Sequence, residues 1–76
     1  MPKKIELEKL GNAIRVYADK DERSYNELAL HAGLGGSSRL VNIMDGKVNI
    51  SVVTLFDIAG TLDVPMEKLF ETYNEF

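Results

Sequence analysis

Residues that begin or end helices recur along this chain at short intervals and leave room only for short helices. Ser24 and Glu27 form a capping box, in which each side chain bonds a backbone N–H at the start of a helix. Gly33 can supply the positive φ that ends this helix, and Pro65 suits the first position of another. We therefore expect a fold of several short helices.

Apolar residues recur at helical spacing between these signals. The helices are predicted at about residues 5–20, 24–32, 37–44, 51–62 and 65–73. Ser37 and Ser51 are expected to cap the third and fourth of these helices. The core-facing side of the fourth is predicted to carry Val52, Leu55, Phe56, Ala59 and Leu62. The predicted fold class is all-α, a compact bundle of about five short helices in one domain of residues 1–76.

The chain has 76 residues and no cysteine, so no disulfide can stabilise its core. A chain of this length buries only about 60% of the surface that its unfolded form exposes. We expect a core that is efficiently packed or completed by a partner chain. The lack of cysteine excludes thiol catalysis and cysteine-ligated zinc, and His31 alone cannot form a metal site. We expect no enzyme activity, metal or cofactor, and a half-buried His31.

The formal net charge of −3 is unevenly distributed. Residues 1–62 carry eight Lys or Arg and eight Asp or Glu, so the negative charge belongs to residues 63–76. Arg39 and Lys47 outnumber Asp45 between residues 37 and 49. A nucleic-acid partner is therefore compatible with the sequence, with modest and salt-sensitive affinity. Because no apolar stretch approaches the roughly 18–20 residues of a membrane span, we expect a cytoplasmic protein.

The helices predicted at 24–32 and 37–44 are joined by a glycine-containing turn, which is typical of a helix-turn-helix motif. In this motif the first helix braces against the phosphate backbone while the second lies in the major groove. The apolar side of the second helix would anchor it to the core, leaving short polar side chains to face base edges. A phosphate-binding glycine loop is disfavoured, because neither a preceding strand nor a following Gly-Lys-Ser/Thr is present.

From about Leu10 to Phe70, the ordered spacing of these features resembles the XRE/Cro/C1-type helix-turn-helix regulators of bacteria and phages. The resemblance rests on Leu10-Gly11, Ile14-Arg15, Ser24, Glu27-Leu28-Ala29, Gly33-Leu34, Leu40, Ile43, Gly46-Lys47, Asn49, Ser51, Leu55, Ile58-Ala59, Leu62, Asp63-Val64-Pro65 and Leu69-Phe70. The size is most similar to restriction-modification controller proteins and small phage Cro-type regulators. The resemblance implies a lambda-repressor-like domain that binds double-stranded DNA and regulates transcription as a homodimer on an inverted-repeat operator.

The resemblance also assigns roles to individual positions. The residues that it places against bases are Ser37, Ser38, Arg39 and Asn42. The residues that it places against phosphates are Ser24, Tyr25, Lys47, Asn49, Ser51 and Arg15. The simpler interpretation of Arg39 and Asn42 is a solvated helix face, and Ser37 is equally suited to capping.

Phe70, Tyr73 and Phe76 recur every three residues near the acidic C-terminus. This narrow apolar stripe is predicted to be a homodimer interface. A two-fold dimer would set its recognition helices about 34 Å apart, which matches successive major grooves. Alternatively, Phe70 packs in the core and the last residues fray.

A second functional hypothesis is a protein-interaction module on the same scaffold, such as an antitoxin or a modulator of a repressor. It is motivated by the net negative charge, by the acidic aromatic C-terminus, and by Ala18, where the family often carries arginine. Such a module would bind DNA weakly or not at all by itself.

Overall fold

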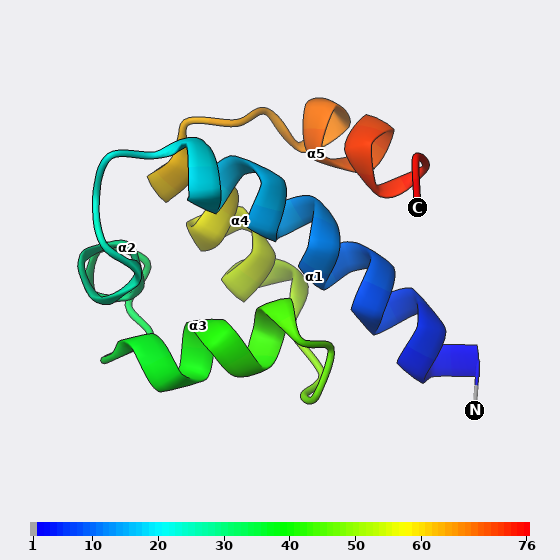
Figure 1. The fold of residues 1–76 in the computed structure, drawn as a ribbon, viewed down its shortest axis with the longest axis horizontal. Helices are drawn as coiled ribbons and strands as arrows, with labels where there is room; N and C mark the ends of the chain where they lie inside the picture. Colours follow the sequence, from blue (N-terminus) through cyan, green and yellow to red (C-terminus); the bar gives the residue numbers. More distant parts are fainter. Residues whose placement is uncertain (1) are drawn as a thin grey trace.

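The computed structural model describes residues 2–76, with side chains from residue 4 onward. This part of the chain forms five α-helices and no strand: α1 (Pro2–Lys20), α2 (Tyr25–His31), α3 (Ser37–Met44), α4 (Val52–Leu62) and α5 (Met66–Tyr73) (Figure 1). The prediction of an all-α fold with five helices is confirmed. Helix α1 begins earlier than predicted, because a proline fits the first turn of a helix without loss of a hydrogen bond. Among the described residues, no helix combines the length and apolar character that crossing a bilayer requires.

Local side-chain caps define where two of the helices start. The capping box of Ser24 and Glu27 is present, and the Ser51 hydroxyl accepts a hydrogen bond from the Thr54 N–H at 3.1 Å. The expected cap by Ser37 is wrong. Gly36 holds the extended backbone of the cap position, so Ser37 is already the first helical residue. Pro65 likewise occupies the cap position of α5, one residue before the helix.

Helix α1 lies between α3 and α5, which pack on opposite sides of it, while α2 packs against α3 and α4 (Figure 1). All five helices contribute to one buried cluster: Ala13, Ile14, Ala18, Leu28, Ala29, Ala32, Leu34, Leu40, Ile43, Met44, Leu55, Ile58, Ala59 and Leu69. Gly11 allows the close approach of α1 to α3, because a Cβ there would lie 2.2 Å from the Met44 carbonyl oxygen. The core is closed without a disulfide.

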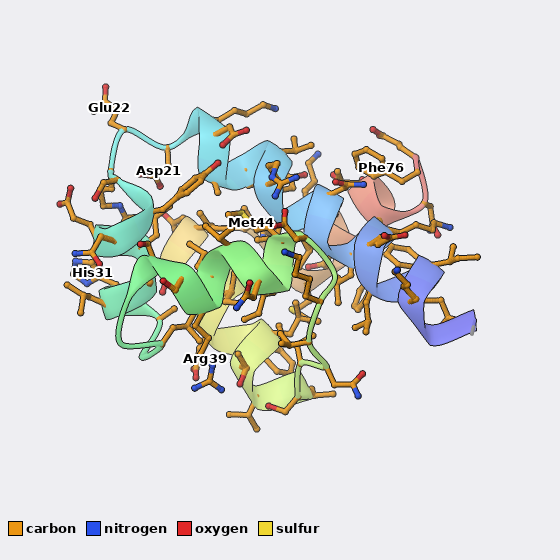
Figure 2. The ribbon with its side chains drawn as sticks, turned by 60° about the horizontal axis from the view of Figure 1, so that its bottom comes forward. Asp21, Glu22, His31, Arg39, Met44 and Phe76 are labelled. Atoms are coloured by element: carbon orange, nitrogen blue, oxygen red, sulfur yellow. The ribbon has the colours of Figure 1, made fainter. Side chains whose placement is uncertain are left out.

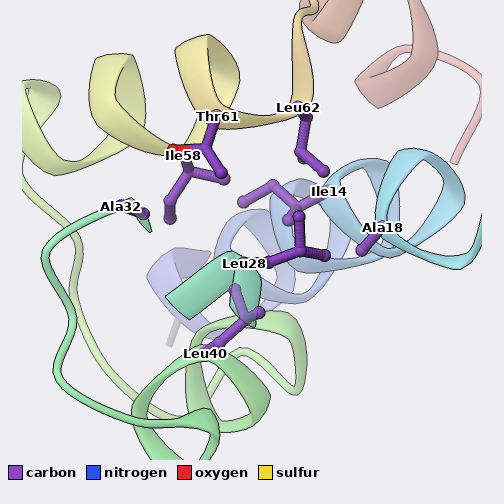
Figure 3. Close-up of a pocket in the computed structure, with 8 residues that line it drawn as sticks. All are labelled: Ile14, Ala18, Leu28, Ala32, Leu40, Ile58, Thr61 and Leu62. Atoms are coloured by element: carbon purple, nitrogen blue, oxygen red, sulfur yellow. The ribbon is translucent and has the colours of Figure 1, made fainter. Parts of the chain in front are cut away.

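A small cavity of about 10 Å³ remains in this core (Figure 3). It is lined mainly by apolar side chains, among them Ile14, Leu28, Leu40 and Ile58. A cavity of this size is at the lower limit for a single water molecule, and an apolar lining gives water few partners. The core therefore offers no room for a small-molecule ligand.

Three expectations about burial are wrong. Val52 and Phe56 were expected in the core, but they are exposed by 66% and 56%. Helix α4 buries the side that carries Leu55, Ile58 and Ala59, and at about 100° per residue this rotation turns Phe56 outward. His31 was expected to be half-buried, but it lies on the exposed side of α2 (Figure 2).

Candidate nucleic-acid interface

One side of α3 presents polar side chains to solvent. Leu40, Ile43 and Met44 bury the opposite side of the helix. Ser38, Arg39 and Asn42 are exposed, and Figure 2 shows Arg39 pointing away from the core. We call these three residues the α3 face. The sequence predicted this division of the helix correctly, because apolar and polar residues alternate at helical spacing.

The polar groups of the α3 face are free to bind a partner. In the part of the chain whose side chains are described, the side-chain hydrogen bonds and ion pairs engage residues other than Ser38, Arg39 and Asn42. Guanidinium can bond guanine at two atoms, carboxamide can do the same with adenine, and hydroxyl can donate or accept. Ser37, the fourth predicted base contact, is the first residue of α3 and is half-buried, so its side chain is less accessible than those of the α3 face.

Two more predicted residues lie in the loop after α3. Gly46 makes the turn with a φ of 72°, and a Cβ there would lie 2.7 Å from Glu8 of α1. Lys47 and Asn49, which follow it, are exposed. A groove between α3 and the start of α4 is lined by Arg39, Ile43, Val48, Asn49, Ile50, Ser51 and Thr54. The structure thus brings Arg39, a predicted base contact, to the same groove as Asn49 and Ser51, two predicted phosphate contacts.

Two of the predicted phosphate contacts are already paired within the chain. Arg15 donates a hydrogen bond to the Asp45 carboxylate at 2.5 Å, which joins α1 to the end of α3. The Tyr25 hydroxyl donates to the Asp19 carboxylate. This hydrogen bond, together with partial burial and the charge of Asp19, raises the pKa of Tyr25. Both residues would have to exchange a carboxylate for a phosphate in order to bind DNA.

Two further predicted contacts serve as helix caps. The Ser24 hydroxyl accepts from the Glu27 N–H at 3.1 Å, and the Ser51 hydroxyl donates to the Thr54 hydroxyl at 3.0 Å in addition to its capping bond. A hydroxyl that caps a helix retains some capacity for a second bond. Lys47 and Asn49 are therefore the predicted phosphate contacts with the freest side chains.

The predicted dimer residues lie on the other side of the molecule, because α1 separates α5 from α3 (Figure 1). Phe70 and Phe76 are exposed by 44% and 49%. Tyr73 packs against the core, with its ring centroid 6.3 Å from that of Phe70 and 4.7 Å from the Lys9 ammonium. The three aromatic residues thus lie near one another, but Tyr73 packs mainly against residues of its own chain.

One polar anchor, in the connector between α1 and α2, was not predicted from the sequence. The Arg23 guanidinium donates to the Thr61 carbonyl at 2.6 Å and to both carboxylate oxygens of Asp21. The hydrogen bonds from the Arg23 side chain and backbone lower the pKa of Asp21 to about 2. The connector therefore ties the start of α2 to the end of α4. No local sequence pattern reveals this contact, because Arg23 and Thr61 are far apart in the chain.

Among the described residues, no cluster of histidine, cysteine, aspartate or glutamate could hold a metal ion. Searches for similar proteins found no matching family model, no matching curated protein and no matching solved structure. The class of protein that fold and surface define is a small five-helix all-α protein with an exposed polar helix face.

Proposed function

We propose that this protein is a sequence-specific DNA-binding transcriptional regulator that acts as a homodimer on an inverted-repeat operator. In this proposal, α2 and α3 form a helix-turn-helix unit of a lambda-repressor-like domain, and α3 lies in the major groove. The observation that supports it is the α3 face, whose three side chains are exposed and unengaged while the helix is anchored by its apolar side. A rigid helix with free base-reading groups is what major-groove recognition requires.

The proposed roles follow from side-chain chemistry. Arg39 would bond guanine, and Asn42 would bond adenine, each at two atoms of the base edge. Ser37 and Ser38 would add single hydrogen bonds at the start of the helix. Lys47 and Asn49 would contact the phosphate backbone and set the register of α3 in the groove.

The first experiment is selection of bound duplexes from a pool of random sequence, followed by fluorescence anisotropy on the enriched sequence. We expect an enriched inverted repeat that is bound at least about a thousandfold more tightly than unrelated DNA. Lys47→Ala should weaken binding, whereas Lys68→Ala, which removes an exposed charge from α5 on the other side of α1, should not. A pool without any enriched sequence would contradict the proposal.

One observation favours a second candidate function. At the start of α2, where a helix-turn-helix protein meets phosphate, the Asp19 and Glu27 carboxylates accept hydrogen bonds from Tyr25 and Ser24, and the exposed Glu22 precedes Ser24 by two residues. These charges would repel DNA and suit a protein-interaction module without independent DNA binding. If selection enriches no DNA and a host protein co-purifies with the chain in a defined ratio, the second function replaces the first.

A further inference from the structure

Helix α4 presents an apolar side to solvent. Val52, Val53 and Phe56 are exposed by 66%, 70% and 56%, while Leu55 and Ile58 on the opposite side are buried. Together the three exposed residues present on the order of 300 Å² of surface, which is at the lower end of the largest apolar patches on typical monomers, and such patches are often functional. A helix that needed only to complete the core of one chain would carry polar residues at these positions.

Gly60 lies on the same exposed side of α4, two turns after Val53. A Cβ added at Gly60 would meet nothing within 4 Å, whereas at Gly11 and Gly46 it would collide with a neighbouring segment. Glycine inside a helix is destabilising relative to alanine. The fold of a single chain therefore explains Gly11 and Gly46, but it gives no reason for a glycine at position 60.

A second copy of the chain accounts for both features. Val53 and Gly60 project from α4 in nearly the same direction, seven residues apart, one as a ridge and the other as a gap. If two α4 helices pack antiparallel about a two-fold axis, each Val53 faces the Gly60 of the other copy, and the two Phe56 rings flank the axis. We infer that the α4 face, made of Val52, Val53, Phe56 and Gly60, is a homodimer interface with this antiparallel arrangement.

The α4 face fits a copy of itself better than an unrelated partner. A two-fold interface uses the same surface on both subunits, so that surface has to contain its own complement. A face that carries both the ridge and the matching gap has this property. The apolar side chains of this face are also typical of homodimer interfaces, which are less polar than transient ones.

The available area predicts a reversible dimer. Helix α4 has 11 residues and is therefore about 16 Å long. A stable interface buries about 800 Å² per partner, and the apolar part of the α4 face supplies less than half of this area. The surrounding polar side chains would make up the rim. We therefore expect a dimer that forms and dissociates with chain concentration.

The position of α4 connects this interface to DNA binding, and this step rests on the proposed function. Helix α4 begins beside α3, and the two share the groove that contains Arg39 and Thr54. In a dimer paired through the α4 face, one wall of this groove would therefore belong to the paired helix. Pairing through α5 would place α1 between the axis and each α3 (Figure 1).

The test of the interface measures the mass of the protein in solution without DNA, by sedimentation equilibrium over a concentration series. We expect wild type to move from its 8.5 kDa monomer towards twice that mass. Gly60→Leu has open space in the monomer and should fold, but it fills the gap that receives Val53. We expect it to raise the dimer dissociation constant at least about tenfold. Glu67→Leu, which places the same apolar side chain on the exposed side of α5, should leave the constant unchanged.

Cross-linking provides an independent readout, because the chain has no cysteine of its own. Asp57 is exposed on α4 close to the proposed axis, so Asp57→Cys should form a covalent dimer under mild oxidation. Lys68→Cys on α5 should remain monomeric. Covalent dimers from Lys68→Cys but not from Asp57→Cys would overturn the inference in favour of the α5 side.

Failure of the interface and failure of the proposed function give different results. Wild type that stays at 8.5 kDa at every concentration, or Gly60→Leu that dimerises like wild type, overturns the α4 interface. DNA selection can still succeed in either case. Conversely, dimers that are sensitive to Gly60→Leu support the interface even when selection enriches no DNA sequence.

Discussion

Helices α3 and α4 follow one another in the chain and line a common groove, and each exposes one face, but the two faces differ in chemistry. Ser38, Arg39 and Asn42 on α3 are polar and can be hydrated fully in the free protein. Val53 and Phe56 on α4 are apolar and remain in contact with water until something covers them. The α3 face therefore suits a polar partner, whereas the α4 face suits an apolar protein surface.

The largest expected effect is on the free energy of unfolding, and two glycine-to-alanine substitutions measure it. One is in α1 beneath the α3 face, and the other is in the α4 face. Gly11→Ala places a methyl group against backbone atoms of Met44, so α1 and the α3 helix that it supports must move apart. We expect a loss of about 3 kcal/mol in the free energy of unfolding. Gly60→Ala meets no atom and improves helix propensity, so it should stabilise the monomer by about 0.5–1 kcal/mol.

Urea unfolding of both variants at low chain concentration measures this difference, because dilution keeps dimer formation from contributing. Circular dichroism should show that both variants remain helical before the transition. Equal effects at the two positions would show that α1 does not need its close approach to α3.

Arg39→Ala tests whether the α3 face reads DNA sequence. Because the Arg39 side chain is exposed and unengaged, its removal should leave the unfolding transition unchanged. On the selected operator we expect a loss of about 2 kcal/mol, which is roughly thirtyfold in affinity, with relaxed preference at one base pair. Anisotropy titrations on the operator and on single-base variants measure both effects. Lys68→Ala, which removes an exposed charge from α5, should leave the base preference as it is.

Lys47→Ala tests whether Lys47, in the loop after α3, contacts the phosphate backbone of DNA and not a base. Lys47 is exposed in the loop after α3, where the proposed function places a phosphate. The substitution should weaken binding to all sequences alike and reduce the slope of log affinity against log salt by about 1. A change restricted to the operator sequence would instead assign Lys47 to base recognition.

The smallest expected effect is a pH dependence of local stability at the C-terminal end of α4, where Arg23 bonds the Thr61 carbonyl. Hydrogen bonds from Arg23 hold the pKa of Asp21 near 2, below its ordinary value of 3.8. The Asp21–Arg23 ion pair therefore contributes fully to the stability of the fold above pH 3.8, and this contribution is lost as the pH falls towards 2.

Carboxyl NMR shifts of Asp21 should titrate with a midpoint near 2 and move together with the amide shift of Leu62. Amides of α3 should not follow this titration, because the Arg23 anchor joins the connector to α4 alone. In Asp21→Asn the Leu62 response should disappear. A midpoint close to 3.8 in wild type would show that the pair is not formed in solution.

Much of the fold could be predicted from the sequence because helix ends are local. The capping box at Ser24, the positive φ of Gly33 and the break at Asp63 depend on neighbouring residues, and the structure has all three. The α3 face could also be predicted, because a short helix with one apolar side has only one way to face the core. These features follow from the chain within a few residues of each position.

The sequence by itself thus determined the number and type of the helices, the lack of a disulfide, and the polar character of the α3 face. Only the tertiary structure decided which side of α4 is buried, because nearly all sides of that helix are apolar and only packing against α2, α1 and α5 selects one. It also decided that Arg15 and Tyr25 are paired with carboxylates that come from other helices or other turns. Such contacts depend on how separate segments meet in space, and no local pattern contains that information.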